Sequence, residues 1–154
     1  MRLAQSTPAD LPRIRHEHLG WLLERVDRLF ARLVSKAVHD HGFGDVRLVH
    51  VPLIRAVERD GTRISDIAKR AGITKQATGT LVSEFVQFGY IKIVDHPSDG
   101  RVKMAIYTAK GERLLAACAD ALKDTEGHFL SMIGGSDFTR LKTVLQRIII
   151  SAEE

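Results

Sequence analysis

Residues 64–111 read ISDIAKRAGITKQATGTLVSEFVQFGYIKIVDHPSDGRVKMAIYTAKG, and this stretch decides the fold. In its first half, apolar residues recur at the three- and four-residue spacing of two short helices. Between them, Gly72 is expected to end the first helix and Thr74 to cap the second, which would run from Lys75 to about Phe88. Two helices joined by a short turn that contains glycine indicate a helix-turn-helix.

After Gly89 the pattern changes from helical to strand-like. Residues 90–94 are apolar and rich in β-branched side chains, residues 95–101 favour a turn, and residues 102–107 favour a second strand. We therefore expect a β-hairpin, or wing, beside the helix-turn-helix. Asp99 and Gly100 would shape its tip, and an ion pair with Asp99 would hold Arg101.

Long helices with apolar faces flank this region on both sides. From His16 to about His39, apolar residues keep helical spacing for about six turns, and two further helices after the wing are separated by Gly134-Gly135. Such a long terminal helix cannot bury its apolar face on a small domain, so we expect a second copy of the chain to cover it.

The order of these elements predicts a mainly α fold with a small β-hairpin wing, that is, a winged helix-turn-helix with flanking dimerisation helices. We divide the chain into a loose N-terminal arm (1–15), a dimerisation helix (16–47), a winged helix-turn-helix DNA-binding region (48–110) and C-terminal dimerisation helices (111–154).

Composition narrows the functional class only mildly. The chain has 154 residues, and its net charge of +4 favours an anionic partner. Its single cysteine, Cys118, excludes a disulfide within the chain and fits a reducing cytosol. No apolar run is long enough to span a bilayer, and the first ten residues lack a secretory signal. We expect a cytoplasmic protein without a membrane partner.

The second helix of a helix-turn-helix lies in the major groove of duplex DNA. Glutamine can bond adenine, lysine can reach guanine or phosphate, and a projecting arginine suits the minor groove. The predicted DNA-binding residues are Thr74, Lys75, Gln76, Thr78, Thr80, Ser83, Arg63, Arg101 and Lys103. Further candidate phosphate contacts are Lys69, Arg70 and Lys92.

Residues 64–111 resemble the DNA-binding region of the MarR family, the multiple-antibiotic-resistance regulators. The features that carry the resemblance are Leu81-Val82, Gly89-Tyr90-Ile91, Asp99-Gly100-Arg101 and Thr108-x-x-Gly111, and the flanking helices match in order and length. Three departures weaken the basic surface. Thr80 stands near a position where the family often has arginine, Ser83-Glu84 stands where it often has Asp-Arg, and Ile93-Val94 where it often has arginine.

The resemblance implies a homodimer, joined through its terminal helices, that represses transcription from near-palindromic operators in double-stranded DNA. Many members release DNA when a small aromatic or anionic effector binds between the dimer helices and the reading head. Trp21 and His50 are candidates for the wall of such a pocket.

Alternative functions remain open at this point. The apolar pair Ile93-Val94 suits a winged helix that binds a protein, and the seven histidines suit a metal-responsive regulator. The cluster His39, Asp40 and His41 is a poor metal site, because adjacent helical residues point apart. Cys118 lies on an apolar helix face and is interpreted as a buried, inert thiol. The chain contains none of the common catalytic or phosphate-binding motifs, so we expect no enzyme, no cofactor and no bound metal.

Overall fold

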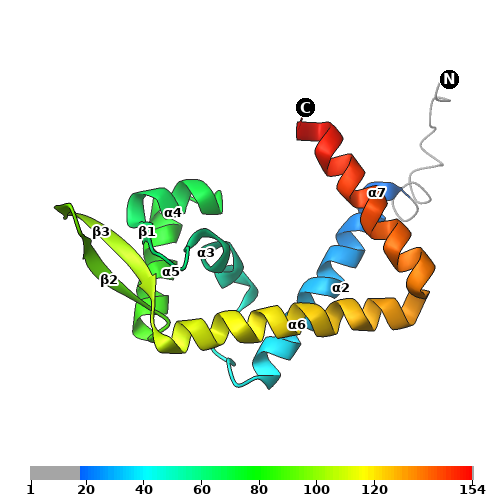
Figure 1. The fold of residues 1–154 in the computed structure, drawn as a ribbon, viewed down its shortest axis with the longest axis horizontal. Coiled ribbons are helices and arrows are strands. Elements are labelled where there is room, and N and C mark those ends of the chain that lie inside the picture. Colours follow the sequence, from blue (N-terminus) through cyan, green and yellow to red (C-terminus); the bar gives the residue numbers. More distant parts are fainter. Residues whose placement is uncertain (1–17, 154) are drawn as a thin grey trace, which may run out of the picture.

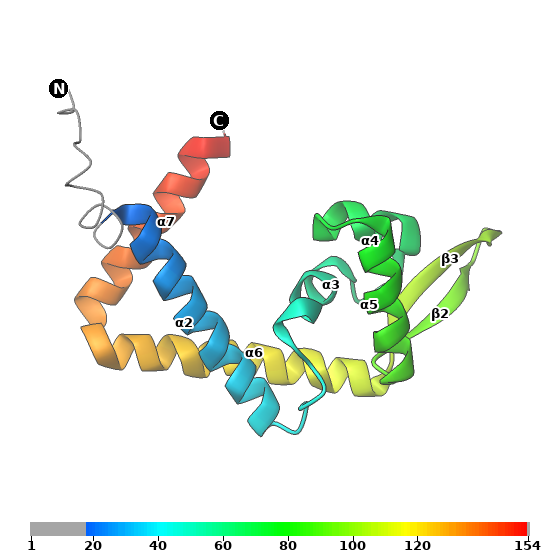
Figure 2. The same cartoon turned by 180° about the vertical axis from the view of Figure 1, so that it is seen from behind.

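The computed structural model describes residues 18–153, and the molecule is a crescent (Figures 1 and 2). Its elements are α2 (Leu19–Asp40), the 3-10 helix η2 (Leu48–His50), α3 (Val51–Ala56), β1 (Thr62–Arg63), α4 (Ile64–Ala71), α5 (Lys75–Gln87), β2 (Ile91–His96), β3 (Asp99–Tyr107), α6 (Ala109–Ile133) and α7 (Gly135–Glu153). We call residues 48–107 the head. The head lies at one end of α6, and α7 lies at the other. The predicted N-terminal arm, residues 1–15, is outside the described residues.

The helix-turn-helix forms as predicted. Gly72 ends α4 with a φ of 66°, a left-handed conformation that glycine adopts without steric cost. The Oγ1 of Thr74 then accepts a hydrogen bond from the backbone N–H of Ala77 at 3.2 Å, which caps α5. Ile73 is partly buried between the two helices and packs against the core of the head.

The wing is a three-stranded antiparallel sheet in the order β1-β3-β2. β2 and β3 form the predicted hairpin, with Ile91 opposite Tyr107. β1 was not predicted, because two residues are too few to show an alternating pattern. It pairs Thr62 with Ala105 and Arg63 with Met104, and it leads directly into α4. The third strand therefore joins the wing to the start of the helix-turn-helix.

The core occupies the head and the adjoining half of α6. Its largest fully buried side chains include Leu53, Ile67, Phe85, Tyr90 and Leu114, which come from five different elements or junctions. The Tyr90 hydroxyl donates a hydrogen bond to Asp45, and the Lys110 ammonium lies 4.2 Å from the centre of the Tyr90 ring. These contacts tie the head to both the segment that follows α2 and the start of α6.

The other end of the crescent is largely uncovered. α2 crosses α6, where the rings of Phe30 and Phe129 are 5.8 Å apart, but no described residue of α7 is buried. Large exposed hydrophobic side chains gather on this end of the molecule: Leu19, Leu22, Leu23, Val26, Leu130, Met132, Ile133, Leu141, Val144, Leu145, Ile148, Ile149 and Ile150. None of the helices in residues 18–153 is both long and apolar enough to cross a membrane.

The predicted fold class is confirmed, since the chain is mainly helical with a small wing. The break after α6 also lies where the sequence indicated, at Gly134. Before the wing, α3 ends at Ala56 and the chain then turns towards β1. The domain division itself stays a prediction.

Candidate nucleic-acid interface

The outward face of α5 carries a row of uncharged polar side chains. The inner face of the helix is formed by Thr78, Leu81, Val82 and Phe85, all of which are buried. At 3.6 residues per turn, the opposite face carries Gln76, Thr80, Ser83 and Gln87, and all four are exposed. Hydroxyl and amide groups arranged this way along a free helix face can bond the edges of bases in a major groove.

Thr78 corrects the sequence interpretation, which placed it among the exposed residues. Its side chain is only 2% exposed, and its Oγ1 donates a hydrogen bond to the carbonyl oxygen of Thr74 at 2.9 Å. The inner face of α5 begins at Thr78 rather than at Ala77, which is exposed. The spacing of Thr78 from Leu81, Val82 and Phe85 could have shown this, but threonine was assigned to the surface for its polarity.

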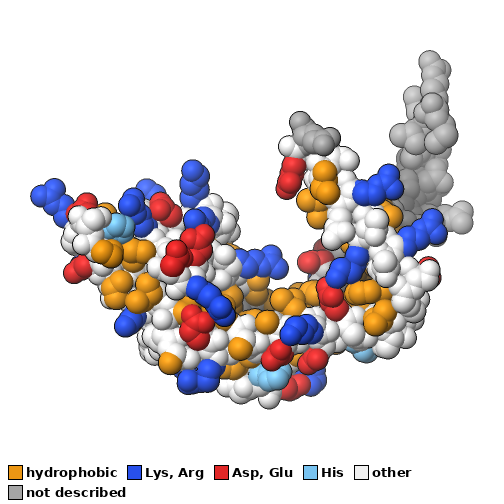
Figure 3. All heavy atoms as spheres, viewed as in Figure 1, with side chains coloured by type: hydrophobic (Ala, Val, Ile, Leu, Met, Phe, Trp, Pro, Cys, Tyr) orange, Lys and Arg blue, Asp and Glu red, His pale blue; other side chains and the backbone are white. Residues whose placement is uncertain are grey.

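Three exposed basic side chains lie on α5 itself, just before α4 and on the wing. Lys75 lies in the first turn of α5, Arg63 immediately precedes α4, and Arg101 lies at the tip of the wing. All three are exposed, and no acidic group of residues 18–153 lies within ion-pair distance of them. Figure 3 shows Lys and Arg side chains projecting from the head. These unpaired cations are available to bind phosphate.

Two other predicted cations already have partners. Lys103 pairs with Asp95 across the hairpin, and Arg70 pairs with Glu58. The hydrogen bond that Arg70 donates to the Glu58 carboxylate raises the pKa of Arg70 above its ordinary value. A DNA phosphate would have to compete with these carboxylates, so Arg70 and Lys103 are weaker candidates than Arg63 and Arg101. Lys69 and Lys92 are exposed and lie on α4 and β2.

The tip of the wing is held by its backbone. The Oδ1 of Asp99 accepts a hydrogen bond from the backbone N–H of Arg101 at 3.0 Å. The ion pair predicted between these two side chains is absent from the described contacts. Asp99 shapes the turn as expected, but it leaves the Arg101 guanidinium exposed and unpaired.

A groove runs along α2, facing the head. One part, of about 480 Å³, is lined by Arg25, Asp27, Arg28, Ala31, Arg32 and Leu48. The next part, of about 350 Å³, is lined by Arg32, Ser35, Lys36, His39, Asp40 and Leu48. Arg28 pairs with Glu24 and Lys36 with Asp40, whereas Arg25 and Arg32 have no acidic partner within residues 18–153. The groove therefore combines unpaired guanidinium groups with an apolar edge at Leu48.

The two candidate pocket residues lie in different environments. Trp21 is partly exposed one turn before Arg25, whose guanidinium carbon is 5.3 Å from the centre of the indole ring. His50 is fully buried, with its ring 5.1 Å from that of Phe85 and 6.0 Å from that of Phe88. His50 therefore lies behind Leu48 in the core of the head and not on an open wall.

The remaining candidates from the sequence are the histidine cluster around His39 and the thiol of Cys118. His39 Nε2 bonds the carbonyl oxygen of Gly44 at 2.5 Å, and no group of three ligand side chains within residues 18–153 is arranged to hold a metal ion. Cys118 is partly buried beside a cavity of about 50 Å³, and burial raises the pKa of its thiol. A raised pKa lowers the thiolate fraction and therefore the reactivity of this cysteine.

A comparison with known protein families matches the region of the chain that the sequence pattern had singled out. The sequence model of the MarR family matches residues 44–102. No curated protein matches this chain. Among solved structures, a mutant of MarR from E. coli has a TM-score of 0.71 at 15% identity and covers 86% of this chain and 96% of that chain.

Two further solved structures are regulators that hold ligands. PcaV from Streptomyces coelicolor, in complex with its natural ligand, has a TM-score of 0.64 at 17% identity and covers 97% of this chain and 99% of that chain. CouR from Rhodococcus jostii RHA1, bound to p-coumaroyl-CoA, has a TM-score of 0.65 at 23% identity and covers 86% and 92%. At these identities the likeness shows the fold. The resemblance seen in the sequence is thus confirmed: the model of the MarR family matches residues 44–102, and the chain has the fold of solved MarR-family structures.

Proposed function

We propose that this protein is a sequence-specific DNA-binding transcriptional repressor that acts as a homodimer on a near-palindromic operator. The observation that carries the proposal is the exposed row Gln76, Thr80, Ser83 and Gln87 on α5, with unpaired cations on both sides of it. The cations would bind phosphates and set the position of the head, and the uncharged row would bond base edges. The wing would place Arg101 in the neighbouring minor groove.

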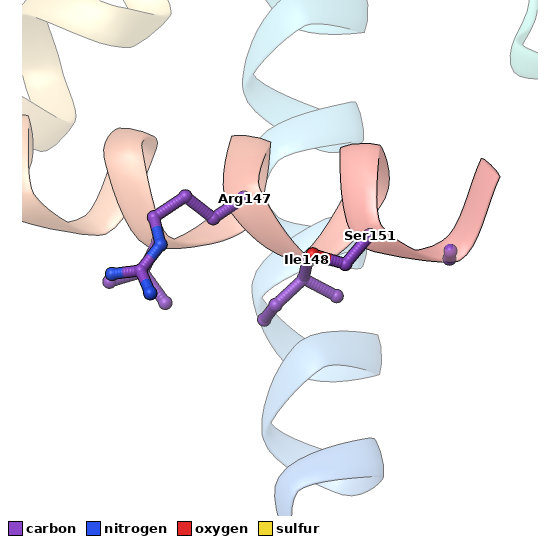
Figure 4. A pocket seen from close by; sticks show the side chains of 5 residues that line it. Arg147, Ile148 and Ser151 are labelled. Carbon is purple, nitrogen blue, oxygen red and sulfur yellow. The ribbon is translucent and has the colours of Figure 1, made fainter. Parts of the chain in front are cut away.

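A second copy of the chain is the natural cover for α7. This 19-residue helix buries none of its residues, and the side chains of Ile148, Ile149 and Ile150 are each more than half exposed. Figure 4 shows Arg147, Ile148 and Ser151 on α7, where they line an open hollow of about 420 Å³. Continuous apolar surface of this extent marks an interface. Pairing through it would place two heads on one duplex.

The groove along α2 is the proposed effector site. Its unpaired Arg25 and Arg32 would attract a carboxylate or phosphate, and Leu48 with the nearby Trp21 would contact an aromatic or aliphatic group. The ligands bound in the PcaV and CouR structures support a ligand-responsive role. A small aromatic or anionic compound is the class that fits the groove.

Footprinting on DNA beside the protein's own gene tests the proposal. Two protected half-sites, related by a dyad and about one helical turn apart, are the expected result. If no fragment binds at low salt, where phosphate attraction is strongest, the proposed function is wrong.

A second candidate is a winged helix that binds a protein. The exposed Val86 and Ile93 on the head favour it, because exposed large apolar side chains can form part of a protein interface. Replacing both Lys75 and Gln76 by Glu separates the two. Loss of DNA binding supports DNA recognition, while a partner bound through Val86 and Ile93 would be unaffected.

A further inference from the structure

His50 is fully buried, and both of its ring nitrogens have partners. Nδ1 accepts a hydrogen bond from the backbone N–H of Arg47 at 3.0 Å, and Nε2 lies 2.8 Å from the Oε2 of Glu84. A backbone amide can only donate, so Nδ1 must be the acceptor. Nε2 therefore carries the proton and donates it to the carboxylate.

Glu84 is shared between two partners. Besides His50, its two oxygens accept from the Nη2 of Arg47 at 3.1 and 3.3 Å. The hydrogen bond from His50, together with the charge of Arg47, lowers the pKa of Glu84 despite partial burial. The carboxylate is thus held ionised and in one orientation.

These three residues connect two parts of the molecule that lie far apart in the sequence. Arg47 and His50 bracket the segment that leads from α2 into the head, whereas Glu84 lies on α5, 34 residues beyond His50. The rings of Phe85 and Phe88 pack against His50, which is fully buried, whereas the Glu84 carboxylate is partly exposed and the Arg47 side chain is exposed. Leu48, which lines the groove along α2, lies between Arg47 and His50 in the same short segment.

Glu84 would otherwise be unfavourable where it stands. An acidic side chain on a helix that faces DNA repels phosphate. A compensating structural role explains its presence here.

We infer that Arg47, His50 and Glu84 are positioning residues, a latch that fixes α5 relative to the segment leaving α2 and so sets DNA affinity without touching DNA. The inference rests on the proposed function. A ligand in the groove along α2 would displace Leu48. Because Leu48 belongs to η2, this displacement would shift α5.

The test measures DNA binding by the Glu84→Ala and Glu84→Gln variants, with fluorescence anisotropy as the readout over a range of salt concentrations. Glu84→Ala should weaken DNA binding about tenfold, because it removes the hydrogen-bonded network of the latch. Glu84→Gln retains an acceptor for His50 and should lose less affinity for DNA. Because no phosphate contact is removed, the salt dependence of the affinity should not change.

The matched control is Glu58→Ala, which removes an acid of the head whose partner, Arg70, is not bonded to a buried group. Freeing Arg70 should strengthen binding. If Glu84 is merely a repelling charge, Glu84→Ala and Glu84→Gln will also bind more tightly, and the latch is wrong. Failure of the wild-type protein to bind any DNA would instead overturn the proposed function.

A spectroscopic measurement covers the case in which the variants do not fold. Long-range ¹H–¹⁵N correlation spectra of the wild-type protein at pH 7 should show His50 as the neutral tautomer with its proton on Nε2. A proton on Nδ1, or on both nitrogens, would contradict the geometry on which the latch depends.

Discussion

Gly111 lies so close to the carbonyl group of Tyr90 that a Cβ at position 111 would be 2.0 Å from the carbonyl oxygen. The approach joins three elements, because Tyr90 lies between α5 and the wing, while Gly111 lies in the first turn of α6. Thr108 reinforces the junction: its Oγ1 donates to the carbonyl oxygen of Gly89 at 2.6 Å and accepts from the N–H of Gly111 at 3.1 Å. This explains the Thr108-x-x-Gly111 pattern physically.

Gly111→Ala should destabilise the protein by about 3 kcal/mol or more, because the backbone of Tyr90 cannot move away without disturbing α5 and β2. Urea denaturation at a fixed protein concentration measures the change. Gly79→Ala is the control. It also adds a methyl group to a helix, but nothing lies within 4 Å of the added Cβ, so it should stabilise by about 0.5 to 1 kcal/mol. If the two substitutions changed the stability by the same amount, the close approach of Gly111 to Tyr90 would be contradicted.

Thr74→Ala should cost about 1 kcal/mol of stability, since it removes the cap of α5. Thr74→Ser keeps the hydroxyl and should restore most of the loss. Thr80→Ala is the comparison within the same helix, because its exposed hydroxyl bonds only the carbonyl of Gln76. Its stability should stay within about 0.5 kcal/mol of wild type. An uncapped variant as stable as wild type in thermal denaturation would contradict the assignment of the cap.

Arg101→Ala should weaken binding to specific and unrelated DNA alike and should reduce the slope of log affinity against log salt by about one. The reason is that Arg101 is exposed and unpaired at the tip of the wing. Lys123→Ala removes the same charge from α6, where Lys123 lies 3.7 Å from Asp120, and should leave the slope unchanged. A selective loss of specific binding by Arg101→Ala would instead indicate that Arg101 reads bases.

Ile148→Asp should convert the proposed homodimer to monomers and abolish operator binding, because it places a charge on the exposed apolar face of α7. Gln146→Asp adds the same charge two residues earlier, on the opposite face of the helix, and should leave the dimer intact. Sedimentation velocity at micromolar concentration distinguishes the species. Wild-type protein that sediments as a monomer would remove the basis for pairing through α7.

The sequence predicted those features that a local pattern encodes. The turn at Gly72, the cap at Thr74, the hairpin and the break at Gly134 each depend on residues that are neighbours in the chain. Features that depend on distant contacts were missed. The two-residue strand β1 exists only through its pairing with β3, and the partners of Lys103 and Arg70 were not visible without the fold.

The candidate site follows the same rule. Thr78 was misplaced because its chemistry suggested exposure, although its helical spacing puts it on the inner face. His50 was expected on a pocket wall, but Phe85 and Glu84, both far along the chain, enclose it. The basic groove along α2 became apparent only when Leu48 was placed opposite Arg25 and Arg32.

Directed DNA cleavage tests the central claim, that the outward face of α5 enters the major groove in each half of a dimer. With Cys118→Ala as background, Gln87→Cys on α5 and Ser151→Cys on α7 would each carry a tethered iron chelate. The account predicts that the label at 87 cuts operator DNA at two places related by the dyad and that the label at 151 does not cut. Cleavage from position 151, or none from position 87 while DNA is bound, would contradict it.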